Sequence, residues 1–227
     1  MLFFNFNPYI AIIGDIKASK KSTDRKEIQI RLNDVLREIN LKYKKDIASN
    51  FTITLGDEFQ GLLNQGTNVM NIIFDIEKKM FPTKLRFGIG VGEITTDINP
   101  EISIGSDGPA YYKARESVIF LKEVERRRKT AISSIRIELD SENRMASELM
   151  NTILSLTEVI KNSWTDRQRE VIWDMMEYQD GQVNVANRLK VSQPAIQRCL
   201  TGGKYYAYKE AVDTITRTLS GIRREDV

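Results

Sequence analysis

Residues 51–63 read FTITLGDEFQGLL, and this stretch indicates the fold class. Its two ends are apolar and rich in β-branched or aromatic residues, as in two short strands of a sheet. Between them stands Gly56-Asp57-Glu58, a glycine followed by two acids. Glycine and aspartate are common in tight turns because of the backbone conformations and local hydrogen bonds they allow. The stretch therefore predicts a β-hairpin with an acidic tip.

The segments around the hairpin complete an alternation of strands and helices. YIAIIGDI at residues 9–16 predicts a buried central strand, and apolar residues at helical spacing predict the helices. The predicted elements are strand 9–16, helix 23–44 with Thr23 as its cap, hairpin 51–63, helix 67–81, strand 84–95, helix 109–128 and strand 132–139. This order predicts an α+β fold that begins as a ferredoxin-like (split βαβ) arrangement, with helices on one face of an antiparallel sheet.

The composition excludes several kinds of catalytic and metal sites. The chain has 227 residues, one cysteine, no histidine and a formal net charge of +3. Without histidine there is no Ser-His-Asp triad, and a metal would be held by oxygen ligands, which suit Mg²⁺, Mn²⁺ or Ca²⁺. A single cysteine makes no internal disulfide, and the apolar N-terminal run is too short to span a bilayer. We therefore expect a cytoplasmic protein with no membrane partner.

The character of the sequence changes near Asp140. Glycine becomes sparse, strand patterns stop, and amphipathic helical patterns follow. We expect a first domain of residues 1–140, a helical linker of residues 141–163, and an all-α domain of residues 164–227.

Two acids of the first domain form a candidate metal site. Asp15 ends the first strand and Asp57 lies in the hairpin turn, and these positions are neighbours in a split βαβ sheet. Two close carboxylates repel each other unless a cation lies between them or one is protonated. Gly14 and Gly56 would let a ligand approach the backbone, and Ile16 would offer its carbonyl. Taken singly, each acid is equally compatible with an ordinary turn residue.

The residues around these acids carry a resemblance. GDIKAS at 14–19 and TLGDEFQGLL at 54–63 resemble the metal-binding segments of class III nucleotidyl cyclases and of GGDEF-type diguanylate cyclases. The resemblance implies a palm domain in which Asp15 and Asp57 hold Mg²⁺ or Mn²⁺ and Glu58 lies beside the bound nucleotide.

A second segment, GPAYYKARESV at 108–118, is similar to a cyclase helix in which an asparagine precedes an arginine by four residues. Arg115 matches that arginine, so the resemblance gives it the catalytic role of stabilising phosphate charge. Tyr111 stands in the asparagine's place beside the nucleotide. The resemblance also implies a homodimer in which Arg115 acts on the partner's site. From the residues alone, Arg115 is equally compatible with a solvated charge on a helix.

The C-terminal stretch VNVANRLKVSQPAIQRCL, residues 183–200, follows a helix-turn-helix pattern. In this pattern Ser192 caps the second helix, while Gln193, Gln197 and Arg198 face outward, where they could read bases of double-stranded DNA. Basic residues around them could contact phosphates; these are Arg188, Lys190 and Lys204. A helical bundle used for protein contacts remains the alternative.

The order of these segments most resembles the SatD family, which couples a palm-like region to a C-terminal DNA-binding-type segment. The combination predicts a DNA-binding transcriptional regulator whose palm binds a nucleotide with Mg²⁺. Two alternatives stay open: an active nucleotidyl cyclase or oligonucleotide synthase regulated by its C-terminal domain, and a degenerate palm that serves only for dimerisation.

Overall fold

The computed structural model describes residue 2 and residues 4–17, 25–128 and 133–224 of the chain. The predicted helix cap Thr23 and strand start Ile132 lie outside these residues. The chain divides into two compact units: the first contains Met1–Thr152 with Ile215–Val227, and the second contains Ile153–Thr214.

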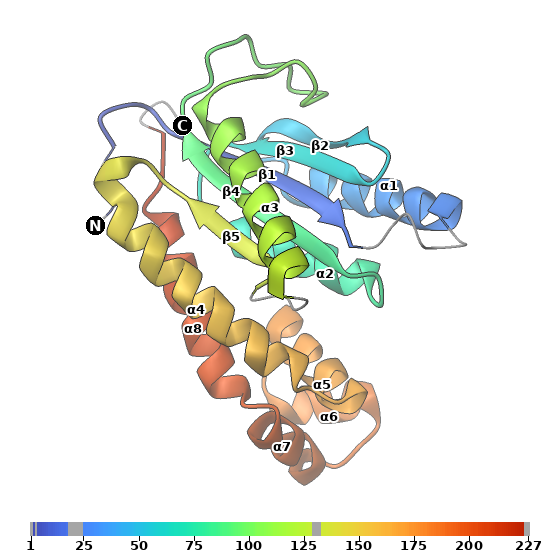
Figure 1. Cartoon of the computed structure of the whole chain (residues 1–227). Coiled ribbons are helices and arrows are strands. Elements are labelled where there is room, and N and C mark those ends of the chain that lie inside the picture. The colour runs from blue at the N-terminus through green and yellow to red at the C-terminus, as the bar shows by residue number, and fades with distance from the viewer. Residues whose placement is uncertain (1, 3, 18–24, 129–132, 225–227) are drawn as a thin grey trace. The chain divides into compact units, whose positions relative to one another are not determined.

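A five-stranded sheet with the order β2-β3-β1-β4-β5 forms the centre of the first unit (Figure 1). Its strands are β1 (Tyr9–Ile16), β2 (Ile47–Leu55), β3 (Glu58–Leu63), β4 (Leu85–Gly92) and β5 (Ile135–Glu138). β1 pairs antiparallel with β3 on one side and with β4 on the other, and β2 pairs antiparallel with β3. The predicted split βαβ arrangement is confirmed for these four strands, and β5 adds a parallel strand beside β4.

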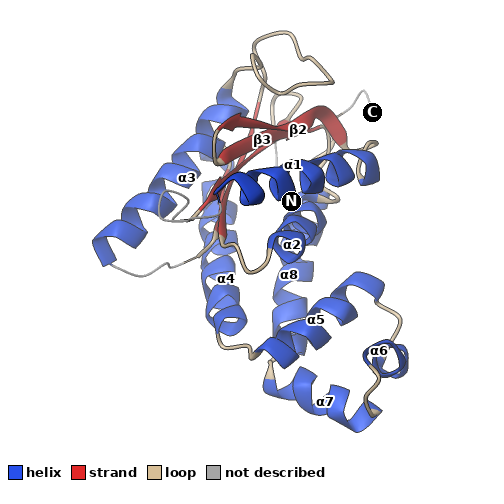
Figure 2. Cartoon of the chain, turned by 90° about the vertical axis from the view of Figure 1, so that its right-hand side faces the viewer, coloured by secondary structure: helices blue, strands red, loops and turns tan. Residues whose placement is uncertain are grey.

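Helices cover both faces of this sheet. α1 (Arg25–Lys42) and α2 (Val69–Met80) lie on one face, as predicted for the split βαβ part, and α3 (Pro109–Arg128) lies on the other (Figure 2). The prediction of helices on one face was made for the first six elements and is confirmed for them, while α3, which follows them, covers the opposite face. The physical reason is the connection: α3 joins the parallel strands β4 and β5, and such a crossover helix packs on a face of the sheet.

Glycines of β4 bring α3 unusually close to the sheet. A Cβ atom at Gly88 would lie 2.1 Å from the carbonyl oxygen of Ala114, and one at Gly90 would lie 2.1 Å from that of Ala110. Because these neighbours are helix backbone, they cannot rotate away as a side chain can. The glycine-rich strand β4 therefore allows α3 to pack directly against it and sets the distance between that helix and the sheet.

The predicted hairpin is confirmed, with one change at its tip. β2 ends at Leu55, and Gly56 turns the chain with a left-handed φ of +63°. The backbone N–H of Ile16 donates to the carbonyl of Asp57 over 3.1 Å, so the turn is tied to the end of β1. Glu58 does not sit at the tip but begins β3, where it pairs with Asp15. The two acids of the turn therefore occupy different environments.

The second unit is built from helices, and two long helices belong to both units. After a short 3₁₀ turn (Ser141–Asn143), the helices are α4 (Arg144–Asn162), α5 (Asp166–Tyr178), α6 (Gln182–Leu189), α7 (Gln193–Gly202) and α8 (Tyr205–Ser220). The division falls inside α4 and α8, whereas the change in sequence pattern predicts boundaries at residues 140 and 163. Within the described residues, no helix has both the length and the apolar character needed to cross a membrane.

The start of α5 and the core of the second unit follow the sequence pattern. Thr165 and Gln168 form a capping box: each side chain accepts a hydrogen bond from the other residue's backbone N–H, at 3.2 and 2.9 Å. The core holds the aromatic ring of Trp164 together with apolar residues of α5, α6 and α7, which include Ile172, Val185, Ile196 and Leu200.

Candidate functional site

Asp15 lies between Glu58 and Arg86 in the register of the sheet. It is the cross-strand partner of Glu58 in β3 and of Arg86 in β4. All three side chains contact residues of α3, so they lie on the face of the sheet which that helix covers. The predicted proximity of the end of β1 and the hairpin is thus confirmed, and it brings an arginine to the same place.

Both carboxylate oxygens of Asp15 are engaged by basic side chains. Arg86 Nη1 donates to Oδ2 at 2.8 Å, and Lys122 Nζ of α3 lies 2.7 Å from Oδ1. The side chain of Asp15 is only 6% exposed. A carboxylate buried to this degree requires nearby opposite charge, because removing it from water without a partner is costly. The two cations supply that charge.

The ion pairs continue beyond Asp15. Arg86 also donates from Nε and Nη2 to a single oxygen of Glu125 on α3, at 3.1 and 2.8 Å. Lys17 Nζ lies 3.8 Å from the same oxygen. Arg86 therefore bridges two acids and is itself largely buried, with 12% of its side chain exposed.

Glu58 binds Arg115 within the same chain. Arg115 Nη1 of α3 donates to Glu58 Oε1 at 2.9 Å, and its side chain is 48% exposed while that of Glu58 is 12% exposed. Arg115 and Lys122 are seven residues, or about two helical turns, apart and therefore share a face of α3. The predicted catalytic arginine is thus part of the same cluster as the predicted metal acid.

The other predicted nucleotide-binding residues have packing roles in this structure. The ring of Phe59 fills the space beside Gly14, and Ile16 is buried. Gln29 Nε2 donates to the carbonyl of Gly56 at 2.5 Å, which ties the turn to α1.

Tyr111 lies in the apolar core between α3 and the sheet rather than at the ion-paired cluster. It is 5% exposed and packs with residues that include Ala11, Ile13 and Leu62. Its hydroxyl has no hydrogen-bond partner among the described residues. Burial raises the pKa of the Tyr111 hydroxyl well above its usual value.

The residues around Asp15, as they lie, do not fit a divalent cation. Mg²⁺ and Mn²⁺ require direct contact with oxygen atoms, and each oxygen of Asp15 already contacts a basic side chain. Among the described ranges, no group of three or more Asp, Glu or Cys side chains is arranged to hold a metal ion. The cluster is a network of ion pairs that joins three strands to α3.

α7 presents the residues predicted to read DNA. Gln193, Gln197 and Arg198 are exposed, while Ile196 and Leu200 of the same helix are fully buried. This is the division between an inner and an outer face that a recognition helix requires.

A polar network joins α7 to its neighbours, and sequence reasoning missed it. Gln193 Nε2 donates to Gln182 Oε1 and Gln182 Nε2 donates to Gln197 Oε1, both at 2.5 Å. Gln182 Nε2 also donates to the hydroxyl of Tyr206 at 3.1 Å. Gln182 opens α6 and Tyr206 lies in α8, so the two glutamines are held by both flanking helices.

Arg188 differs from Gln193, Gln197 and Arg198 because its guanidinium is held by ion pairs within the second unit. Its guanidinium donates to Asp174 and to Asp180, and its Cζ lies 4.2 Å from the centre of the Tyr178 ring. The hydrogen bonds to Asp180 and Asp174 raise its pKa above the usual arginine value. The expected phosphate contact therefore competes with two existing ion pairs.

The other three predicted DNA-binding residues lie at helix ends. Lys190 ends α6 and Lys204 lies between α7 and α8; both are exposed and have left-handed φ values of +53° and +56°. Ser192 occupies the N-cap of α7, as predicted, but its side chain makes no capping hydrogen bond. Its backbone carbonyl instead accepts from the N–H groups of Ala195 and Ile196. The hydroxyl of Ser192 is therefore left exposed beside the predicted base-reading residues.

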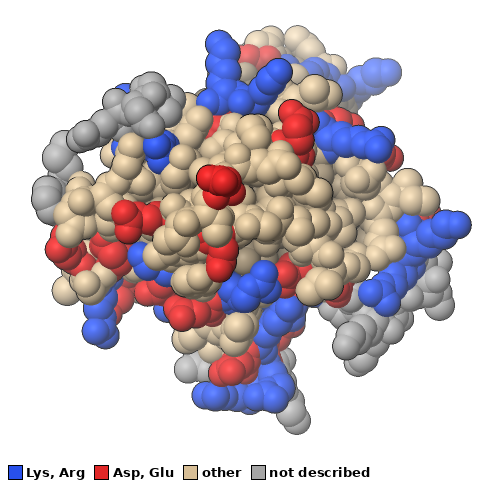
Figure 3. All heavy atoms as spheres, turned by 90° about the horizontal axis from the view of Figure 1, so that it is seen from above, with Lys and Arg blue, Asp and Glu red and all other residues tan. Residues whose placement is uncertain are grey.

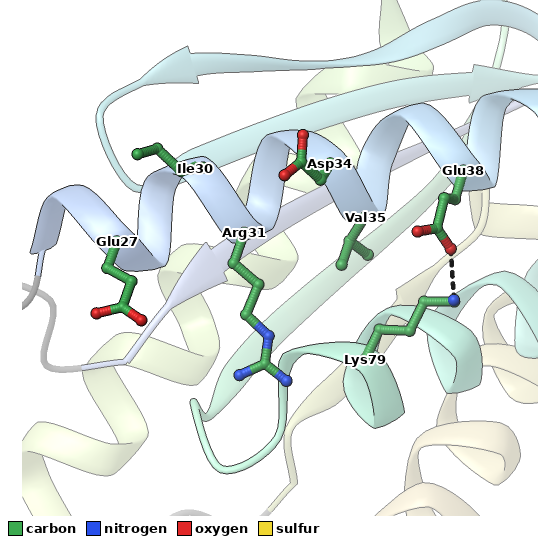
Figure 4. A pocket seen from close by; sticks show the side chains of 7 residues that line it. All are labelled: Glu27, Ile30, Arg31, Asp34, Val35, Glu38 and Lys79. Carbon is green, nitrogen blue, oxygen red and sulfur yellow. Dashed lines mark hydrogen bonds and ion pairs between the residues drawn. The ribbon is translucent and has the colours of Figure 1, made fainter.

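A separate pocket of about 450 Å³ lies between α1 and α2, on the other side of the sheet from Asp15 (Figure 4). One edge is closed by an ion pair between Lys79 and Glu38, and Arg31 donates to the carbonyl of Phe81. The lining also includes Glu27, Ile30, Asp34 and Val35. The pocket mixes charges of both signs and contains none of the residues predicted to bind a ligand.

The face seen from above shows acidic and basic side chains interspersed, mostly toward its margin (Figure 3). Over the described residues in this view there is no continuous basic surface of the kind that attracts nucleic acid.

Several solved cyclase structures resemble part of this chain at low sequence identity. A bacterial light-regulated adenylyl cyclase shares 15% identity over 57% of this chain and 74% of its own, with a TM-score of 0.42. The guanylyl cyclase Cya2 shares 12% identity over 62% and 78% of the two chains, with a TM-score of 0.38. The guanylate cyclase domain of RhGC from Catenaria anguillulae, in complex with GTP, shares 18% identity over 49% and 72%, with a TM-score of 0.36.

The fold is described by the sheet and the helices, and the family is shown by a family model. The first unit is a mixed five-stranded sheet covered by helices, and a set of helices follows it. The model of the SatD family matches residues 9–215, so the chain belongs to the SatD family. A search of curated protein sequences gave no match.

Proposed function

We propose that this SatD-family protein is a cytoplasmic, DNA-binding transcriptional regulator whose palm-like unit binds a nucleotide. The observation that carries the proposal is the outer face of α7, where Gln193, Gln197 and Arg198 are exposed above a buried apolar face. Glutamine can form paired hydrogen bonds with adenine, and arginine with guanine, in the major groove. The N-terminal half of such a helix is the part that meets base edges.

Other residues complete the proposed DNA interface. Lys190 and Lys204 flank α7 at its two ends and are exposed, which suits contacts to phosphates on either side of the groove. The exposed hydroxyl of Ser192 can also donate to a phosphate. Arg188 has a different role in this proposal: its ion pairs with Asp174 and Asp180 hold α6 against α5.

The nucleotide would bind through the basic groups of α3. Arg115 and Lys122 are about half exposed, and their inner hydrogen bonds to Glu58 and Asp15 fix where their remaining donors point. Phosphate oxygens accept charge-assisted hydrogen bonds of this kind. A Mg²⁺ or Mn²⁺ ion at Asp15 and Asp57 would first have to displace Lys122. The nucleotide experiment must therefore measure whether nucleotide binding requires a metal ion.

A homodimer would bring two copies of α7 to one DNA duplex. α4 exposes an apolar row, in which Met145, Leu149, Leu156 and Val159 are 59–69% exposed. Their positions, with Thr152 between them, follow the alternating four- and three-residue spacing of a coiled-coil seam. A second copy of the same helix offers a matching row, and a two-fold dimer matches the symmetry of paired half-sites in DNA.

DNA binding is tested with duplex fragments enriched from random sequence by the purified protein. We expect binding that falls steeply with salt, because each neutralised phosphate releases counterions. We also expect loss of sequence preference in a Gln193→Ala/Gln197→Ala variant that keeps its Tm. Absence of duplex binding at low salt would refute the regulator.

Nucleotide binding is tested by the shift in Tm that each of the four NTPs produces, with Mg²⁺ and with EDTA. A ligand that binds only the folded state raises Tm by mass action. Arg115→Ala should reduce the shift, whereas Arg127→Ala, which removes an exposed arginine elsewhere on α3, should not. A uniform absence of shifts would exclude nucleotide binding and favour a palm that serves only for dimerisation.

An active nucleotidyl cyclase or oligonucleotide synthase is the second candidate. It is favoured by the adjacency of Asp57 to the end of β1 and by the half-exposed Arg115. It predicts pyrophosphate release from an NTP in the presence of Mg²⁺ or Mn²⁺, abolished by Asp15→Ala and by Asp57→Ala. If none of the four NTPs releases pyrophosphate with either metal, this candidate is excluded.

A further inference from the structure

We infer that Lys122 takes the place of a divalent cation at Asp15, so that the palm-like unit carries a built-in positive charge where a metal would otherwise bind. The inference rests on the proposed ligand site of the palm-like unit. It specifies that this site works without a metal ion on Asp15.

The geometry of Asp15 leaves no free oxygen for a metal ion. Lys122 Nζ lies 2.7 Å from Oδ1 and Arg86 Nη1 lies 2.8 Å from Oδ2. A Mg²⁺ ion would need to approach one of these oxygens to about 2.0–2.1 Å. An ammonium group and a divalent cation cannot share that position, because like charges a few ångströms apart repel strongly in a buried setting.

Of the two cations, Lys122 is the one that corresponds to an exchangeable ion. Arg86 is 12% exposed and is held at its other side by two hydrogen bonds to Glu125. Lys122 is 43% exposed and makes its ion pair from the edge of α3. The lysine therefore stands on the solvent side of Asp15, where an entering ion would arrive.

The packing of α3 on the sheet places Lys122 beside Asp15. The helix packs against Gly88 and Gly90, which have no side chains and so let it approach the sheet closely. Arg115, two turns earlier, is held by Glu58 on the neighbouring strand. Two anchors on one helical face thus hold this part of α3 close enough to the sheet for the Lys122 ammonium group to contact Asp15.

The charge of the cluster also argues against an added dication. The ion pairs around Asp15, taken with the turn acid Asp57, contain as many basic groups as acidic ones: Lys17, Arg86, Arg115 and Lys122 against Asp15, Asp57, Glu58 and Glu125. A site that binds a dication normally offers uncompensated carboxylates. Here the acids are already balanced, and an entering anion would instead meet the half-exposed basic groups.

The experiment measures Mn²⁺ binding by electron paramagnetic resonance on the full chain without nucleotide. Wild-type protein should show no Mn²⁺ binding that depends on Asp15. Lys122→Met frees Oδ1 and should create one Mn²⁺ site, which a second substitution, Asp15→Asn, should remove. Lys79→Met is the matched control: Lys79 is 40% exposed and also pairs with a carboxylate, but on the other face of the sheet.

Two results would overturn the inference. One is wild-type Mn²⁺ binding that Asp15→Asn abolishes. The other is a Lys122→Met protein that has the circular dichroism of the wild type and gains no Mn²⁺ site. The Mn²⁺ measurement contains no nucleotide, so its result does not depend on whether the protein binds one. A failure of this inference can therefore be distinguished from a failure of nucleotide binding in the Tm assay.

Discussion

The ring of Phe59 occupies the space that a side chain at Gly14 would need. The two residues are cross-strand partners in β1 and β3, and a Cβ atom built on Gly14 would lie 2.0 Å from Cζ of Phe59. Phe59 is fully buried and packs edge-on against Phe87 of β4, with ring centres 6.1 Å apart. The glycine before Asp15 is therefore explained by packing in the core next to the ion-paired cluster.

Gly14→Ala should destabilise the protein. The added methyl group forces Phe59 or the strand to move, and overpacking of this kind typically costs about 1–3 kcal/mol. Chemical denaturation should show the loss as a lower free energy of unfolding. Adding Phe59→Leu should recover part of it, because the two substitutions act on one contact and are not additive. A Gly14→Ala protein as stable as the wild type would contradict this account.

The long periodic segments of the fold could be predicted from the sequence. The strand 9–16 and the helix 109–128 match β1 and α3 at both ends, because each is bounded by a clear change in pattern. β2 begins at Ile47, earlier than predicted, since its first residues are more polar and pair with β3 through register shifts. An irregular edge strand lacks the alternation on which the prediction depends.

The candidate site could be predicted only in part. Topology brings the end of β1 to the hairpin, so the neighbourhood of Asp15 and the turn followed from the order of elements. The contacts of Asp15 with Arg86 and Lys122 could not be predicted in this way. They depend on the register of the strands and on which face of α3 packs against the sheet. Two features of the sequence could have indicated these partners: Arg86 is a charged residue inside the otherwise apolar strand LRFGIGVG, and Lys122 follows Arg115 by seven residues.

Arg86→Met should be among the most destabilising substitutions in the first unit. It leaves the buried Asp15 and the partly exposed Glu125 with one cation fewer, and breaking a buried pair such as Asp15–Arg86 typically costs about 3–5 kcal/mol. Denaturant titration measures the loss. The double variant Arg86→Met/Asp15→Asn should be more stable than Arg86→Met alone, because it removes an uncompensated charge. A further loss in the double variant would argue against this pairing.

Arg198 and Arg188 should respond differently to substitution. Arg198→Ala removes an exposed side chain from the outer face of α7, so we expect weaker DNA binding, by about 1–3 kcal/mol for one base contact, with an unchanged Tm. Arg188→Ala removes the ion pairs to Asp174 and Asp180, so we expect a lower Tm. Fluorescence anisotropy with labelled duplex DNA and a thermal melt of each variant separate the two effects. If Arg188→Ala instead weakened DNA binding at an unchanged Tm and Arg198→Ala lowered the Tm, the roles given to the two arginines would be wrong.

Tyr111→Phe should stabilise the protein and flatten its response to alkaline pH. The Tyr111 hydroxyl is buried with no partner among the described residues, and such a group typically costs about 1–3 kcal/mol. Burial raises the folded-state pKa of Tyr111 above the ordinary value of 10.0. Above pH 10 the unfolded chain therefore loses this proton while the folded chain keeps it, so wild-type stability falls as pH rises through that range.

Unfolding at pH 8 and at pH 10.5 tests both parts of this prediction. The variant should be more stable at pH 8 and should lose less stability on going to pH 10.5. Tyr112→Phe is the neighbouring control: its hydroxyl is exposed and donates to Asp107 at 2.7 Å, so removing it should bring no gain at pH 8. If Tyr111→Phe lowers stability at pH 8, the hydroxyl has a favourable partner, and the role predicted for Tyr111 beside a nucleotide regains support.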